Sequence, residues 1–165
     1  MAGRTVRVLM VCMGNICRSV AAEMVLRHLA AERGLTVAVD SAGFSDEEHG
    51  NDIYPPMKEA LRRHGIPFTR HAARQMTAAD AERFDLLIGM DRVNLWGIRQ
   101  TCGEEKDNGL GLPRYSMLLD WAGHNDAVIE DPWYTRNFDL ALGEIIEGCT
   151  GLLDTLEAKG LAARD

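Results

Sequence analysis

A short apolar segment that leads through a glycine-containing loop into a helix is the feature of this sequence that most restricts its fold. Residues 6–11 are mostly apolar and rich in valine, which is typical of a strand buried on both faces. A helix is predicted over residues 19–33, and Gly34 supplies its end. Strands buried on both faces occur in parallel sheets that are covered by helices.

The rest of the chain continues to alternate between predicted strands and helices. Strands are predicted over 35–39 and 84–90 and around Val128 and Ile129, with another short element over 115–119. Helices are predicted over 55–64 and 91–100, and the apolar residues between Phe138 and Leu156 recur at helical spacing. We therefore expect one α/β domain over residues 1–165, with its ligand site beyond the carboxyl ends of parallel strands.

The charge balance excludes several classes of partner. The 165 residues include 18 Lys and Arg against 25 Asp and Glu, a formal charge of −7. Without a basic cluster, such a chain repels nucleic acids and anionic membranes, so we expect neither as a partner. No apolar stretch is long enough to span a bilayer, and no signal peptide is evident. Four cysteines are too few for a disulfide scaffold, so we expect free thiols in a reducing cytoplasm.

The loop between the first strand and the first helix has the spacing Cys12, five residues, Arg18, Ser19. Backbone N–H groups at a helix N-terminus favour an oxyanion such as phosphate, and the Arg18 fork matches two of its oxygens. Gly14 permits a positive φ and Asn15 tolerates one, so the loop can curl tightly. These surroundings favour a nucleophilic Cys12 thiolate, to which Ser19 can donate.

Two other interpretations of the loop stay open at this point. A cysteine considered alone, without the spacing to Arg18 and Ser19, favours a small buried apolar side chain at a strand end. A metal site on Cys12 and Cys17 would need two further ligands, and neither His49 nor His71 has the spacing of a zinc finger.

The loop also resembles the signature of the low-molecular-weight protein tyrosine phosphatases. The resemblance rests on Val11-Cys12-Met13-Gly14-Asn15-Ile16-Cys17-Arg18-Ser19, Ala22-Glu23, Asp40-Ser41-Ala42-Gly43, His64-Gly65-Ile66, His71-Ala72-Ala73-Arg74-Gln75, Phe84-Asp85, Met90-Asp91 with Asn94, and Asp131-Pro132-Trp133-Tyr134. It implies a three-layer fold with a four-stranded parallel sheet and helices on both faces. It also implies hydrolysis of phosphotyrosine proteins or small aryl phosphates to inorganic phosphate, without metal or cofactor, and we expect a monomer.

The resemblance further implies a role for each site residue. Cys12 matches the nucleophile that becomes a phosphocysteine, and Asp131 matches the general acid and base, although an Asp-Pro pair alone indicates only a turn. Arg18 and the loop residues bind the phosphate; these residues are Met13, Gly14, Asn15, Ile16, Cys17 and Ser19. Asp91, at the end of the third predicted strand, is expected only to support the site.

Residues around the loop complete the expected site. In the family, Asn15, Ser41 and His71 match positions that hydrogen-bond to one another and hold the loop. Cys17 matches a cysteine that traps oxidised Cys12 as a disulfide, which protects it from further oxidation.

The expected pocket walls are Glu47, Trp133 and Tyr134, and two of them depart from the family pattern. Glu47 stands where many members carry an aromatic residue, and Trp133 stands where they usually carry Tyr. An acidic wall favours neutral or basic phosphopeptides over acidic ones. Ile16 is typical of tyrosine-directed members, whereas related protein-arginine phosphatases carry Thr there.

Two other functions compete with this prediction. Thioredoxin-linked arsenate reductases share a similar loop but use two further cysteines close together, whereas Cys102 and Cys149 are far apart. A phosphate-binding module without turnover would need neither the Cys12 thiol nor the Asp131 acid. Hydrolysis therefore remains the prediction.

Overall fold

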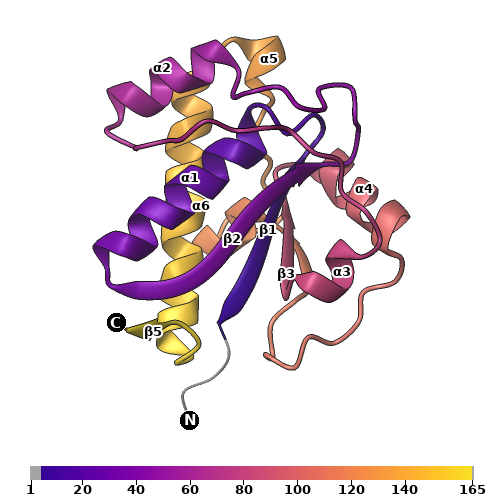
Figure 1. The fold of residues 1–165 in the computed structure, drawn as a ribbon. Helices are drawn as coiled ribbons and strands as arrows, with labels where there is room; N and C mark the ends of the chain where they lie inside the picture. The colour runs from indigo at the N-terminus through magenta and orange to yellow at the C-terminus, as the bar shows by residue number, and fades with distance from the viewer. Residues whose placement is uncertain (1–4, 165) are drawn as a thin grey trace.

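The computed structural model describes residues 5–164, and its centre is a five-stranded sheet in the order β4-β3-β1-β2-β5 (Figure 1). Four strands are parallel: β1 (Val6–Cys12), β2 (Leu35–Gly43), β3 (Leu86–Gly89) and β4 (Tyr115–Met117). The two-residue β5 (Ala163–Arg164), which the sequence did not predict, pairs antiparallel with the start of β2. The expected α/β fold with a four-stranded parallel sheet is confirmed.

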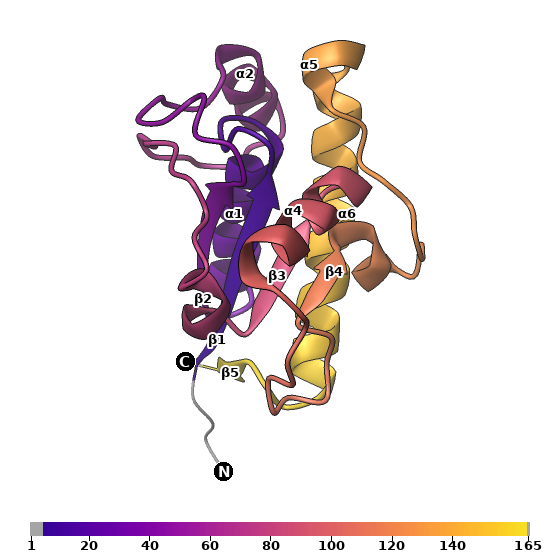
Figure 2. The ribbon, with the colours of Figure 1, turned by 90° about the vertical axis from the view of Figure 1, so that its right-hand side faces the viewer.

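Helices cover both faces of the sheet. The helices α1 (Arg18–Glu32), α2 (Pro55–Arg63) and α6 (Phe138–Ala158) share one buried core, into which Val8 and Met10 of β1 project. Leu9 and Val11 project into a second core that includes Ile98 of α4 (Arg92–Cys102), and Figure 2 views the molecule from this side. The short elements are α3 (Asp80–Arg83), η1 (Leu118–Ala122) and α5 (Pro132–Thr135).

The prediction of a fourth strand around Val128 and Ile129 is wrong. The fourth strand is instead Tyr115–Met117, within the segment predicted only as a short element, and its pairing covers the outer edge of β3. Ile129 is fully buried and donates one backbone hydrogen bond of 2.9 Å to Met90 just beyond β3. The apolar side chains there therefore reflect burial past the sheet edge and not strand pairing.

The end of β2 lies directly against the loop that follows β1. Both strands run further than the apolar pattern suggested, and Cys12 pairs with Gly43 in the last register position. A Cβ atom at Gly43 would lie 2.5 Å from the Met13 carbonyl oxygen, so only glycine lets the two backbones approach this closely. Beyond β2, Gly43 also forms an isolated parallel bridge with Gln75.

The Asp52 side chain links the segment between β2 and α2 to α2 itself and to the segment that follows α2. Its carboxylate accepts hydrogen bonds from the Lys58 ammonium (2.6 Å) and from the backbone N–H groups of Ile53 (2.7 Å) and His71 (2.9 Å). The hydrogen bond from Lys58 is the main reason why the pKa of Asp52 falls from its ordinary value to about 2.

Among the helices of residues 5–164, none combines the length and apolar composition that a membrane crossing requires.

Two glycines of α6 differ sharply in the space around them. A Cβ atom at Gly151 would lie 2.2 Å from the Trp121 carbonyl oxygen, whereas nothing lies within 4 Å of one at Gly143. We expect Gly151→Ala to lower the free energy of unfolding by about 1–3 kcal/mol through overpacking. Gly143→Ala should raise it by about 0.5–1 kcal/mol, because alanine favours the helix. Urea unfolding of both variants tests the contrast, and equal effects would contradict it.

The lowered pKa of Asp52 predicts a pH-dependent contribution to stability. Since the folded state lowers this pKa to about 2, the contribution is complete above the unfolded-state pKa and is lost as the pH falls toward about 2. Asp52→Asn should therefore be less stable than the wild type at about pH 6, with a smaller difference at about pH 3. Urea unfolding at both pH values measures the difference, and a constant difference would argue against this role for Asp52.

Candidate active site

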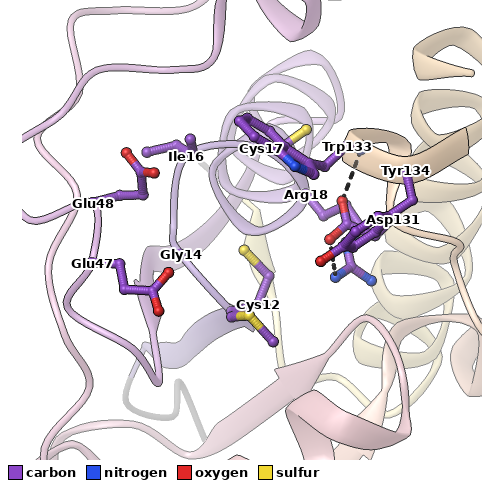
Figure 3. A pocket seen from close by; sticks show the side chains of 11 residues that line it. Cys12, Gly14, Ile16, Cys17, Arg18, Glu47, Glu48, Asp131, Trp133 and Tyr134 are labelled. Carbon is purple, nitrogen blue, oxygen red and sulfur yellow. Dashed lines mark hydrogen bonds and ion pairs between the residues drawn. The ribbon is translucent and has the colours of Figure 1, made fainter. Parts of the chain in front are cut away.

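A cavity of about 190 Å³ opens where the chain passes from β1 into α1 (Figure 3). It is lined by Cys12, Arg18 and Asp131, although Cys12 and Asp131 lie more than a hundred residues apart in the sequence. The remaining lining residues are Met13, Gly14, Ile16, Cys17, Glu47, Glu48, Trp133 and Tyr134. The structure thus brings most of the residues predicted from the sequence into one pocket.

Cys12 ends β1 at the base of this pocket, where it is 4% exposed. Its sulfur lies 2.9 Å from the Ser19 hydroxyl oxygen. The Asn15 amide already donates a hydrogen bond of 2.9 Å to that same oxygen, so the Ser19 hydrogen is free to point at the sulfur. Ser19 is therefore arranged to donate a hydrogen bond to the Cys12 sulfur.

Asn15 holds the curled loop through its side-chain amide and its backbone carbonyl. Its Nδ2 donates to Ser19 and Ser41 (2.9 Å each), and its Oδ1 accepts from the Arg74 backbone N–H at 3.0 Å. Its own carbonyl oxygen lies 2.7 Å from His71 Nε2. The residue is fully buried with φ 59°, so it needs all of these partners.

Two details differ from the sequence prediction for this loop. The positive φ belongs to Asn15 and not to Gly14, which instead provides space, since a Cβ atom there would lie 3.2 Å from Glu48 Cγ. Asn15 and Ser41 do hydrogen-bond to one another, but His71 reaches the Asn15 backbone and not the Ser41 hydroxyl. The three residues still converge on the same turn of the loop.

Glu23 extends this set of hydrogen bonds and was not predicted to have a role of its own. The Ser41 hydroxyl donates to Glu23 at 2.5 Å, and Arg27 donates to the same carboxylate at 2.6 Å. Glu23 is 7% exposed, which is unusual for a carboxylate. An acidic residue on the apolar side of a predicted helix, four positions before Arg27, is the signal that could have identified it.

Arg18 is held in place through one of its terminal nitrogens. Its Nη1 donates to Asp91 at 2.7 Å and to the Ile129 carbonyl at 2.8 Å, whereas Nη2 lies 3.5 Å from Asp131. Burial disfavours the charged guanidinium, but the negative charges of Cys12, Asp91 and Asp131 outweigh burial and raise its pKa. Arg18 is therefore a fixed cation with an edge left for a ligand.

Asp91 and Asp131 occupy equivalent positions at the starts of two helices. The Asp91 carboxylate caps α4 by accepting from the Asn94 N–H at 2.8 Å, and it supports Arg18 as expected. The Asp131 carboxylate caps α5 by accepting from the Trp133 N–H at 3.0 Å, with Pro132 at the first helical position. The second oxygen of Asp131 remains on the pocket side, as Figure 3 shows.

The expected wall residues form two opposite sides of the pocket mouth. Glu47 and Glu48 lie across the opening from Trp133 and Tyr134 (Figure 3). Trp133 is 48% exposed and packs on the Tyr54 ring with centroids 4.8 Å apart. The mouth is therefore acidic on one side and aromatic on the other.

Cys17 also lines the pocket but differs from Cys12 in its surroundings. Burial first, and then the negative charges of Cys12 and Asp131, raise the pKa of the Cys17 thiol well above its ordinary value. Cys102 and Cys149 lie outside the pocket, at the end of α4 and in the core. Within residues 5–164, no three His, Cys, Asp or Glu side chains are grouped as metal ligands.

Known proteins resemble this chain in sequence. Residues 7–162 match the family model described as low molecular weight phosphotyrosine protein phosphatase. The Bacillus subtilis low molecular weight protein-tyrosine-phosphatase YfkJ is 38% identical over 92% of this chain and 96% of its own. The human low molecular weight phosphotyrosine protein phosphatase is 33% identical over 91% of this chain and 95% of its own.

Solved structures agree with these sequence relationships. The crystal structure of YfkJ has a TM-score of 0.85 with 37% identity and covers 95% of this chain and 98% of its own. The structure of DARP, a Drosophila arginine phosphatase, has a TM-score of 0.79 with 31% identity over 91% of this chain and 97% of its own. The chain therefore belongs to the low-molecular-weight phosphotyrosine protein phosphatase family.

Proposed function

We propose that this enzyme hydrolyses phosphotyrosine and aryl phosphate monoesters through a phosphocysteine on Cys12. The observation that carries the proposal is the convergence of Cys12, Arg18 and Asp131 in one 190 Å³ cavity. The Cys12 thiolate attacks phosphorus, the bond from phosphorus to the phenolic oxygen breaks, and protonated Asp131 gives its proton to that oxygen. Water then attacks the phosphocysteine while Asp131 takes its proton, and inorganic phosphate and the thiolate are released.

The loop supplies the electrostatic part of this reaction. The backbone N–H groups between Met13 and Arg18 and the free edge of the guanidinium are suited to the phosphate oxygens as charge redistributes between them. Ser19 stabilises the sulfur both before attack and when it leaves, because the same hydrogen bond serves both states. No step in this sequence requires a metal or a cofactor.

The pocket mouth supports an aryl substrate carried by a neutral or basic peptide. Trp133 and Tyr134 offer aromatic surface to the phenyl ring, while Glu47 disfavours acidic flanking residues. Phosphoarginine is the competing substrate, because DARP shares the fold and is an arginine phosphatase. Ile16 at the loop favours phosphotyrosine, and comparing the two phosphorylated amino acids in peptides of one sequence decides between them.

The first test is hydrolysis of p-nitrophenyl phosphate with EDTA present. We expect Cys12→Ser to abolish turnover and Asp131→Ala to lower kcat by about 10²–10⁴-fold, since it removes the acid. Cys102→Ser is the matched control, because this thiol lies outside the pocket, and it should keep wild-type turnover. If phosphate protects Cys12 from alkylation but the wild type shows no turnover, the site binds phosphate without hydrolysing it.

We also propose that Cys17 protects Cys12 from irreversible oxidation. Peroxide oxidises the Cys12 thiolate to a sulfenic acid, and the Cys17 thiol then condenses with it to form a disulfide and water. Both cysteines line the same cavity, and each lies within electrostatic range of the other. Such a reversible thiol needs a reducing compartment, which supports a cytoplasmic location.

The redox proposal predicts a difference in recovery and not in initial activity loss. Peroxide should inactivate both the wild type and Cys17→Ala, because both retain the Cys12 thiolate. Dithiothreitol should restore the wild type but only a fraction of Cys17→Ala, in which the sulfenic acid proceeds to higher oxidation states. Full recovery of Cys17→Ala, or poor recovery of the Cys102→Ser control, would refute the protective role.

A further inference from the structure

A second cavity of about 250 Å³ adjoins the catalytic pocket. It shares Met13, Arg18, Asp131 and Tyr134 with that pocket, so the two spaces meet at the proposed acid. Its other walls come from the start of α4 and from the segment before α5, and they are Asp91, Val93, Asn94, Val128, Ile129, Glu130 and Thr135. The hydrolysis proposed above leaves most of these residues without a role.

Exposed apolar side chains continue from the catalytic pocket into this second cavity. Met13 (42% exposed), Val93 (50%) and Tyr134 (78%) all line it. Trp96 is 56% exposed and follows Val93 by three residues on α4, so the two share a face of that helix. Met13 and Tyr134 line both cavities and Val93 lines only the second, so an aryl phosphate in the catalytic pocket leaves Val93 uncovered.

Glu130 supplies the available charge in this cavity. Asp91, which also lines this cavity, already accepts from Arg18 and from the Asn94 backbone N–H. Within residues 5–164, Glu130 has neither a hydrogen bond from its side chain nor a paired cation, and it is exposed. Burial first, and then the charges of Glu147 and Glu130, raise the pKa of Glu144, whereas His124 lowers it, so Glu130 lies within electrostatic range of a second acidic side chain.

We propose that this cavity, the Val93–Glu130 subsite, binds a lysine or arginine side chain that flanks the phosphotyrosine of a protein substrate. Such side chains lay an aliphatic stem on apolar surface and keep the charged head near water, which matches Val93 and Tyr134 beside Glu130. The inference rests on the proposed function and adds a substrate preference to it.

The test uses phosphotyrosine peptides that differ at a single flanking position. Four positions are varied, the two before and the two after the phosphotyrosine. Each carries lysine, norleucine, alanine or glutamate in turn. At one of these positions, kcat/KM for lysine should exceed that for norleucine by about two- to fivefold at low salt, as for an exposed ion pair. Norleucine should exceed alanine there because of its stem, and high salt should remove only the lysine advantage.

Variants assign these two preferences to the subsite. Glu130→Gln should bring the lysine-to-norleucine ratio at that position to about one, and Val93→Ser should lower the norleucine-to-alanine ratio. Glu104→Gln makes the same charge change two residues beyond the end of α4 and is the control for net charge. Ratios within one protein cancel any change in its catalytic rate.

Two results would overturn the subsite, and both can be distinguished from failure of the proposed hydrolysis. Equal kcat/KM for lysine and norleucine at all four positions, or a ratio that survives Glu130→Gln, would rule it out while turnover of p-nitrophenyl phosphate continued. If the wild type did not hydrolyse p-nitrophenyl phosphate, the chemistry would have failed instead. Calorimetric binding of the same peptides to Cys12→Ser would then decide the subsite, with the same ratios expected between dissociation constants.

Discussion

The active-site loop depends on one buried amide, that of Asn15. A left-handed residue between β1 and α1 turns the loop back on itself, and this conformation costs free energy in any residue with a Cβ atom. The hydrogen bonds to Ser19, Ser41, Arg74 and His71 compensate for that cost, because each satisfies a group that is shut off from water. Because the Asn15 amide donates to the Ser19 oxygen, the Ser19 hydrogen is left to point at the Cys12 sulfur. The geometry of the loop therefore sets the environment of that sulfur.

A second group of contacts depends on where parallel strands end. The strands β1 and β3 stop side by side, which brings Arg18 within 2.7 Å of Asp91, and the chain returns past β3 so that Ile129 offers its carbonyl to the same guanidinium. Asp131 follows two residues later and lines the same pocket. The segment that holds Arg18 through the Ile129 carbonyl therefore also carries the proposed acid to the pocket.

The sequence predicted the parts of this site that depend on local chemistry. The Cys12 loop was predicted from the residues themselves, because the spacing of Cys12, Arg18 and Ser19 before a helix carries meaning at short range. The supporting residues Ser41 and His71 and the wall residues were expected only from the resemblance to the family, and the structure places Glu47, Trp133 and Tyr134 around the same pocket. The fourth strand was misplaced, since the burial of Ile129 past a sheet edge produces the same apolar pattern as a short strand. The role of Glu23 depends on Ser41, which lies on another element, and periodicity holds no information about such long-range pairs.

Arg18 faces two carboxylates through different terminal nitrogens. Its Nη1 is occupied by Asp91 and Ile129, and its Nη2 lies 3.5 Å from the Asp131 carboxylate, on the side that a phosphate would approach. Under the proposed mechanism, a phosphate group at Nη2 would replace the Asp131 carboxylate as the anionic partner of this nitrogen. Arg18 would therefore exchange one anionic partner for another when substrate binds, while Asp91 and Ile129 keep the guanidinium in place through Nη1.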